Sequence, residues 1–191
     1  DTTYHVYVVA TAAGVQDFYA HTSTVVATVL TALQAETGGA SYVYARRIGS
    51  ILRESGAIVA FVQTGDVFLR SVPVLEASTN NPGTAAVLQT LKVPLGLLLD
   101  AIVSVTVSDV TPAAATNALV TSPGQADTAA TSLWSTYVPA TGIATPAAAT
   151  FTGRVITDTS ARIRYRLSAS TTDHTVYPTT AGWVDTRGRL A

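Results

Sequence analysis

Turn signals recur along this chain at intervals of about 8–12 residues, and they restrict its possible folds more than any other feature. The segments RESG, QTGD, TNNPG and PLG each combine residues that favour the corners of tight turns. Between them lie short runs rich in β-branched and aromatic residues, which are typical of strands. The pattern predicts an all-β fold, an antiparallel β-sandwich or jelly-roll-like domain. We expect one β-rich domain over residues 1–191, with loose loops near 110–132 and 139–149.

One segment departs from the strand pattern. Within residues 24–36, apolar side chains recur at the spacing of one helix face: Val25, Val29, Leu30 and Leu33. Gly38 and Gly39 follow as a stop signal. The sequence therefore predicts at most one short helix, at about residues 24–36.

The stretch YARRIGSILRESGAIVAFVQTGDVFLR, from Tyr44 to Arg70, predicts a succession of hairpins. Two apolar runs flank RESG, in which Gly56 suits a position with positive φ. Gly65 and Asp66 then turn the chain into another strand. We interpret this stretch as scaffold rather than as a catalytic loop.

Charged residues are scarce in this chain. They make up 12% of it, about half the share usual in soluble domains. Lys92 is the only lysine, so ten of the eleven basic residues are arginines, which hold carboxylates bidentately at interfaces. We expect the protein to bury surface against copies of itself. The net charge of −1 gives no reason to expect nucleic-acid binding, and no apolar run approaches the ~20 residues of a membrane helix, so no membrane insertion is expected.

Residues that carry out chemistry are missing or scattered. The chain has no cysteine, and His5, His21 and His174 lie far apart without metal-ligand spacing. The twelve acidic residues stand singly, mostly in turns, whereas glycoside hydrolysis requires a pair. Nucleophile-elbow, P-loop and dinucleotide-binding motifs do not occur. We therefore expect a non-enzymatic protein without a cofactor or a metal.

An alternating row of arginines is the most distinctive charge pattern. ARIRYRLS places Arg162, Arg164 and Arg166 on one face of a predicted strand. Three interpretations remain open: neutralisation by solvent and cross-strand carboxylates, a subunit interface, or a site for an anionic glycan or phosphate. The carboxylates considered are those of Asp158, Asp185 and Glu76.

Arg46 and Arg47 open another predicted strand. Adjacent strand residues point to opposite faces, so we expect these two side chains not to act together on one substrate. They are predicted to hold a structural or interface position.

The motif GWVDTRGR near the end of the chain predicts a tie between strands. Trp183 should be buried, with Val184 facing the other way and Asp185 on the side of the tryptophan. We expect Asp185 to pair with Arg187 or with an arginine of the two groups above. Trp134 and Tyr137 are candidate glycan contacts if exposed, and core anchors if buried.

Three segments together resemble a module of bacteriophage tail-fibre and related virion proteins: YHVYVV, YARRIGSILRESGAIVAFVQTGDVFLRSVPV and AGWVDTRGR. The positions that carry the resemblance are Tyr4 to Val6, Arg46 to Ile51, Phe61 with Gln63, Gly65 and Asp66, and Gly182 to Arg189. The chain departs from the module at residues 24–39, where a helix-like segment replaces a short proline-bearing loop.

The resemblance implies a location in the virion and assembly into a homo-oligomer, often a trimer, together with other virion proteins. The leading hypothesis is a non-enzymatic structural component of a phage particle, in a tail fibre, a tail tip or a capsid-attached fibre, where it contacts the host surface. The alternative is a carbohydrate-binding module that recognises receptor glycans. A glycan depolymerase is a third, less favoured hypothesis.

Overall fold

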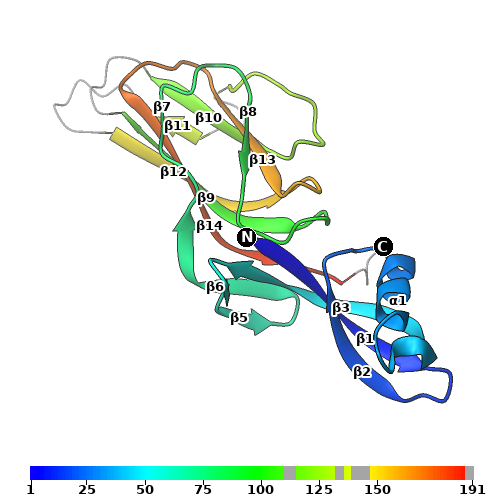
Figure 1. Ribbon diagram of the computed structural model, residues 1–191. Coiled ribbons are helices and arrows are strands. Elements are labelled where there is room, and N and C mark those ends of the chain that lie inside the picture. Colours follow the sequence, from blue (N-terminus) through cyan, green and yellow to red (C-terminus); the bar gives the residue numbers. More distant parts are fainter. Residues whose placement is uncertain (110–114, 132–135, 139–146, 188–191) are drawn as a thin grey trace.

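A computed structural model of the protein describes residues 1–109, 115–131, 136–138 and 147–187. Every pairing among the described strands is antiparallel, and the predicted all-β, sandwich-like fold is confirmed (Figure 1). The elements, in chain order, are β1 (Thr2–Thr11), β2 (Gln16–His21), α1 (Val26–Gln34), a 3-10 turn (Gly39–Ser41), β3 (Tyr42–Glu54), β4 (Ala57–Ile58), β5 (Phe61–Thr64), β6 (Val67–Leu75), β7 (Thr79–Asn80), β8 (Val87–Thr90), β9 (Asp100–Asp109), β10 (Thr116–Thr121), β11 (Thr136–Val138), β12 (Ala147–Ile156), β13 (Arg162–Leu167) and β14 (His174–Val184).

The larger part of the molecule is a sandwich of two sheets. One sheet has the strand order β12-β9-β14-β6-β5, with β7 paired to β14, and we call it sheet B. The other, sheet C, has the order β11-β10-β13-β8. The two sheets share one hydrophobic core, to which β9 contributes Val103 and Val105, β13 contributes Ile163 and Tyr165, and β14 contributes Trp183. Alternation along each strand sends every second residue into this core.

Strand β10 corrects one prediction. The loose loop expected over 110–132 contains this strand at Thr116–Thr121, where Ala118 is buried in the core between the sheets. Likewise β12 begins at Ala147, inside the loop expected at 139–149. The sequence TNALVT is short and has little apolar alternation, so its pairing with β13 determines its conformation.

A smaller unit, which we call the helix lobe, projects from one end of the sandwich (Figure 1). Its sheet A has the order β2-β1-β3-β4, and α1 packs on one face. A separate small core forms there from Tyr7, Val9, Val29 and Leu33. The helix lies within the predicted residues 24–36, although Val25 precedes it and is 57% exposed. The helix lobe comprises β1, β2, α1 and residues 42–47 of β3.

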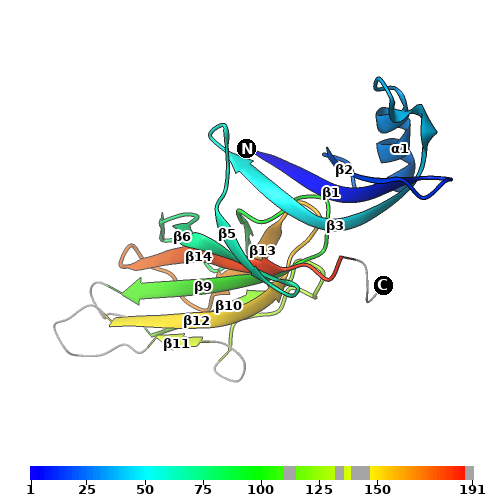
Figure 2. The ribbon, with the colours of Figure 1, turned by 90° about the horizontal axis from the view of Figure 1, so that it is seen from below.

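Strands β1 and β3 pair over their whole lengths and form a ribbon that runs from the helix lobe to the sandwich (Figure 2). One face of the ribbon changes character along its length. Val9 lies beneath α1, while His5 and Ser50 are buried polar residues in the middle. Further along, Leu52 enters the core of the sandwich. The ribbon thus connects two hydrophobic cores through a polar segment.

The turns of the stretch from Tyr44 to Arg70 form as predicted. Ser55 and Gly56 have φ values of 48° and 84° and close the β3–β4 hairpin. Gly65 and Asp66 close the β5–β6 hairpin, with a φ of 59° at the glycine. Gly182 has a different role, since a Cβ there would lie 2.1 Å from the Phe68 carbonyl oxygen. Only glycine permits β14 to approach β6 so closely.

Candidate functional site

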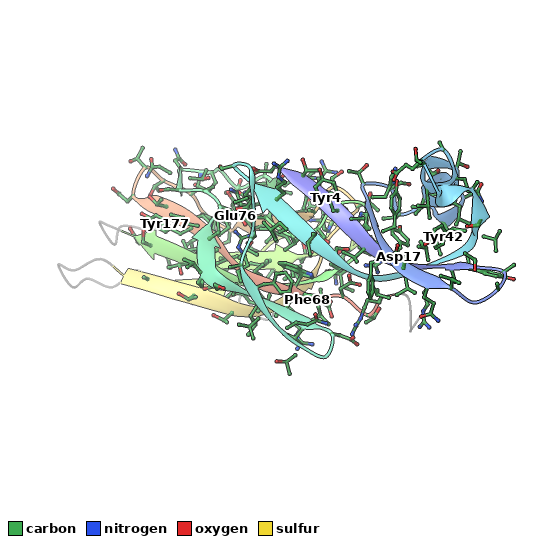
Figure 3. The ribbon with its side chains drawn as sticks, turned by 60° about the horizontal axis from the view of Figure 1, so that its bottom comes forward. Tyr4, Asp17, Tyr42, Phe68, Glu76 and Tyr177 are labelled. Atoms are coloured by element: carbon green, nitrogen blue, oxygen red, sulfur yellow. The ribbon has the colours of Figure 1, made fainter. Side chains whose placement is uncertain are left out.

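Segments that carry the sequence resemblance meet where the ribbon crosses the end of β14. We call this place the joint and define it by His5 on β1, Arg47 and Ser50 on β3, and Asp185 just after β14. All four residues are largely or fully buried. Figure 3 shows the setting: Phe68, Glu76 and Tyr177 mark the sandwich, Asp17 and Tyr42 mark the helix lobe, and Tyr4 on β1 lies between them.

The ion pair between Arg47 and Asp185 is the centre of the joint. Two parallel hydrogen bonds connect them, from Nη1 to Oδ2 at 2.5 Å and from Nη2 to Oδ1 at 2.8 Å. The side chains are 14% and 1% exposed. Trp183 is fully buried and Val184 is half-buried, so the predicted facing of GWVD is confirmed. The predicted pairing of Asp185 with an arginine is confirmed as well, across 138 positions of sequence.

A hydroxyl and an imidazole extend this pair toward β1. Ser50 Oγ accepts a hydrogen bond from Arg47 Nη1 at 3.2 Å and lies 2.8 Å from His5 Nδ1. Since Ser50 receives one proton from Arg47, its own hydroxyl proton is available to Nδ1, and this network assigns the ring proton to Nε2. The ring also hydrogen-bonds the backbone of Leu95.

His5 is held neutral by its surroundings. The pKa of His5 is lowered from 6.5 to about 4, mainly by burial and next by the nearby positive charge of Arg47. Asp185 acts in the opposite direction, but its carboxylate already accepts both bonds from Arg47. At neutral pH the joint therefore holds one arginine and one carboxylate in balance, with an uncharged imidazole beside them.

A second tie fastens the residues after β14 to the β5–β6 hairpin. Arg187 Nη2 lies 2.5 Å from Asp66 Oδ1 and 3.1 Å from the Gly65 carbonyl oxygen. The backbone N–H of Arg187 donates to Asp185 Oδ1 at 2.8 Å, and that of Asp185 donates to the Asp66 carbonyl at 2.9 Å. The motifs RRIGS, QTGD and WVDTR thus interlock. Apart from Arg46, their charged side chains serve as ties within the chain.

Arg46 and Arg47 are adjacent on β3 and point to opposite faces of the strand, as expected. Arg46 is opposite Val8 and exposed, whereas Arg47 is opposite Tyr7 and mostly buried. A β-bulge follows immediately, since Val6 is opposite Gly49 and Ile48 is the extra residue. Both arginines nevertheless line one surface hollow at this bulge. The expectation that they cannot serve one ligand together therefore does not hold at this position.

The arginine row of β13 lies on one face, with Ile163, Tyr165 and Leu167 buried on the other. Asp158 Oδ2 lies 2.7 Å from Arg162 Nη2, which confirms one of the pairings considered from the sequence. Asp185 and Glu76 are not its counter-ions, because Asp185 pairs with Arg47 and Glu76 accepts bonds from Lys92 N and Thr180 Oγ1. The sequence analysis missed Asp127, which lies 3.0 Å from Arg166 and 3.9 Å from Arg164.

Backbone carbonyls complete the coordination of this row. Arg164 donates to the carbonyl oxygens of Ser122 and Gln125, and Arg166 donates to those of Thr84 and Thr128. The row therefore fastens the loop after β10 onto sheet C. Among the three interpretations left open, internal neutralisation by carboxylates accounts for these contacts, although most of the acceptors are main-chain oxygens that no charge pattern predicts.

The candidate glycan contacts lie mostly outside the described residues. Trp134 lies outside the described residues. Tyr137 belongs to β11, where its backbone is opposite Asn117, and its side chain is outside the described part. The joint also includes two residues that the sequence analysis did not select, His5 and Ser50. No spacing rule connects either residue to Asp185, because β-sheet register alone brings them together.

A cleft of about 360 Å³ separates the far end of the ribbon from β8, and its lining includes three acidic residues that the sequence pattern does not group, Asp1, Glu54 and Glu76. Glu54 accepts both guanidinium bonds of Arg70, at 2.9 and 3.0 Å, and these bonds lower its pKa. Glu76 accepts from Lys92 N and from Thr180. A glycosidase general acid requires a raised pKa, so Glu54 is shifted in the wrong direction for that role.

Metal-binding and membrane-spanning features are not found in the described parts of the chain. Residues 1–109, 115–131, 136–138 and 147–187 contain no group of three or more histidine or acidic side chains arranged to hold a metal ion. No helix in these ranges is long and apolar enough to cross a membrane. In comparisons with known proteins, no family model and no curated protein matches the sequence.

Proposed function

We propose that this protein is a non-enzymatic structural component of a phage particle that assembles as a homo-oligomer. The observation that carries the proposal is the outward face of sheet B, which is poor in charge across five strands. The outward residues of β12, β9 and β14 include only two charged side chains, Arg154 and Asp100. A solvent-facing sheet normally alternates apolar with charged or strongly polar residues.

The outward face of sheet B has two zones. One end, the apolar zone, carries Val62 and Leu69, which are opposite each other and are 59% and 44% exposed, and Ile156 at 52%, while Arg154 and Asp100 lie in the same cross-strand rows on β12 and β9. The rest is covered by hydroxyl groups, including Thr106 and Thr150, which hydrogen-bond each other at 2.9 Å. Such a surface loses little solvation when it is covered, and it is the type of surface that subunits bury.

The outward face of sheet A is less suited to burial against a copy of the chain. Phe18 and Tyr44 are 72% and 64% exposed there, but the same face carries Arg46, which has no partner among the described residues. Covering an unpaired guanidinium costs several kcal/mol unless a carboxylate neutralises it. Sheet B also carries an arginine without a partner among the described residues, Arg154, so the assignment of the self-association surface to sheet B rests on its larger outward face, which spans five strands.

The virion setting follows from the resemblance to tail-fibre modules, and the structure is compatible with a scaffold role. Arg47, Asp66, Asp185 and Arg187 of the resembling motifs form internal ties, and Glu54 and Glu76 of the cleft are bonded to internal partners. The alternative, a carbohydrate-binding module, is compatible with the same framework. A depolymerase would require a carboxylic acid with a raised pKa, opposite to the shift at Glu54.

Light scattering on a size-exclusion peak tests self-association. A trimer of 19.7 kDa chains should scatter as about 59 kDa at micromolar concentration. Leu69→Asp should shift the peak toward the monomer, because it places a charge at the centre of the apolar zone. Phe18→Asp, an equal charge change on sheet A, should leave the oligomer intact. A monomer in the unmodified protein, or dissociation by Phe18→Asp alone, contradicts the assignment.

Imaging of phage particles with an antibody against the chain tests the virion setting separately. The antibody should label a fixed position on intact particles. Absence of the protein from purified particles would contradict the structural role, whatever its oligomeric state.

A further inference from the structure

Three arginines surround a hollow of about 260 Å³ beside the joint. We call it the basic hollow, and its lining consists of Val8 on β1, Arg46, Arg47 and Ile48 on β3, and Arg187 after β14. Arg46 and Arg47, which are adjacent on β3, and the bulge residue Ile48 line the same hollow. Two aliphatic side chains form the apolar part of its surface. The lining thus combines guanidinium groups with a small hydrophobic area.

The three guanidinium groups differ in how far they are already neutralised. Arg47 is paired with Asp185, and Arg187 is paired with Asp66. Arg46 is exposed and makes no hydrogen bond or ion pair with any described residue. Among the described residues, two carboxylates thus face three guanidinium groups, and one positive charge has no described counter-ion at the hollow.

The basic hollow also contains hydrogen-bond donors that have no acceptor among the described residues. Arg187 Nε is buried and has no hydrogen-bond partner among the described residues. A buried donor without an acceptor costs about 1–3 kcal/mol, so an acceptor supplied by a ligand would be favoured there. The guanidinium of Arg46 adds a free planar fork that matches carboxylate and phosphate oxygens. Charge and unpaired donors independently indicate an anionic ligand.

We propose that the basic hollow binds the carboxylate or phosphate group of an acidic saccharide, with Arg46 as the main anion contact. Val8 and Ile48 provide an apolar surface for the carbon face of the sugar ring. Among the described residues that line the hollow, only Arg46 lacks a counter-ion, so the hollow does not form the basic stripe that the long phosphate row of a nucleic acid requires. The inference uses the proposed function only for its setting, a particle surface that meets acidic host polymers.

Isothermal titration of the full chain with an oligogalacturonate of defined length provides the test, and glucose 6-phosphate, inorganic phosphate and neutral dextran serve as parallel probes. Saccharide-linked anions should bind in a salt-dependent manner, and dextran should not bind. Arg46→Ala should weaken binding at least about five-fold, the loss expected for one charge-assisted contact. The oligogalacturonate and the sugar phosphate distinguish a carboxylate from a phosphate preference.

Arg53→Ala is the matched control. Arg53 is also exposed, lies on the same strand, and shares the face of sheet A with Arg46, being opposite Thr2. The variant removes the same charge at a distance from the hollow, so its affinity should match that of the unmodified protein. Equal weakening by both substitutions, no effect of Arg46→Ala, or no binding of either saccharide anion overturns the proposal.

Two further measurements distinguish this inference from the structural role. Inorganic phosphate that binds as tightly as glucose 6-phosphate, or a DNA duplex that binds more tightly than the oligogalacturonate, would refute the saccharide assignment. Light scattering of the same samples reports the oligomer, which Arg46→Ala should leave unchanged. If the protein is monomeric and Arg46→Ala still weakens saccharide binding more than Arg53→Ala does, self-association is overturned and the anion site is supported.

Discussion

The helix lobe and the sandwich share the β1–β3 ribbon, yet they are stabilised in different ways. Seventeen buried residues form the described core of the sandwich, whereas four form that of the helix lobe. A core of four side chains is too small to hold a lobe of this size without support. We infer that the stability of the helix lobe depends on its attachment to the sandwich. That attachment is the polar joint of His5, Arg47, Ser50 and Asp185.

The largest expected loss of stability comes from a substitution in the core of the sandwich. Trp183 is fully buried and stacks on Phe68, with ring centroids 5.5 Å apart and planes 4° apart. Trp183→Ala should lower the free energy of unfolding by about 3–5 kcal/mol. Chemical denaturation followed by circular dichroism measures it. Thr159→Ala, in the exposed turn between β12 and β13, is the control and should cost less than about 0.5 kcal/mol.

Acid should weaken the joint before it weakens the sandwich core. His5 has a pKa of about 4 in the folded chain and 6.5 when unfolded, so the unfolded chain binds more protons between these values. Stability should therefore fall as the pH falls from about 6.5 to 4, by up to about 3 kcal/mol, and no further contribution is lost below that.

The variant His5→Asn separates this effect from other titrating groups. Asparagine retains a hydrogen-bond donor and acceptor but carries no charge at any of these pH values. Denaturation midpoints between pH 7 and pH 4 should have a shallower slope in His5→Asn than in the unmodified protein. Equal slopes would show that His5 does not control the acid sensitivity.

A smaller effect is expected when the core of the helix lobe is truncated. Leu33 is 7% exposed and packs with Val29 against β1. Leu33→Ala should cost about 2–3 kcal/mol, the lower part of the usual range because the cluster is small and at the surface. Hydrogen exchange should accelerate in α1 and β2 and stay unchanged in β9 and β13. Uniform acceleration would mean that the lobe and the sandwich unfold as one unit.

The fold was predictable from the sequence to the extent that local rules determine it. Turn residues such as Gly56 and Gly65 indicate hairpins, and alternation in RIRYRL assigns each residue of β13 to a face. Local rules failed at β10, because TNALVT becomes a strand only through its pairing with β13. Residues 24–36 were recognisable as helical because their apolar spacing differs from strand alternation.

The joint was only partly predictable. The facing of Trp183 and Asp185 follows from strand alternation, and a buried carboxylate requires a cationic partner. Several arginines satisfied that requirement, and the sequence does not rank Arg47 above the others. His5 and Ser50 carry no motif, and the bulge at Ile48 that exposes Arg46 and Arg47 to one hollow is a feature of register. Local sequence patterns do not determine the register between strands that are distant in sequence.

Hydrogen exchange on Asp185→Asn tests most directly whether the joint holds the helix lobe to the sandwich. The variant leaves Arg47 buried without a carboxylate, which should cost about 3–5 kcal/mol, whereas Asp158→Asn removes a more exposed partner of Arg162 and should cost less than about 1 kcal/mol. We expect amides of β1, β2 and α1 to lose protection in Asp185→Asn while those of β9 and β13 keep it. Full protection of the lobe in this variant, or the same change in Asp158→Asn, would contradict the account.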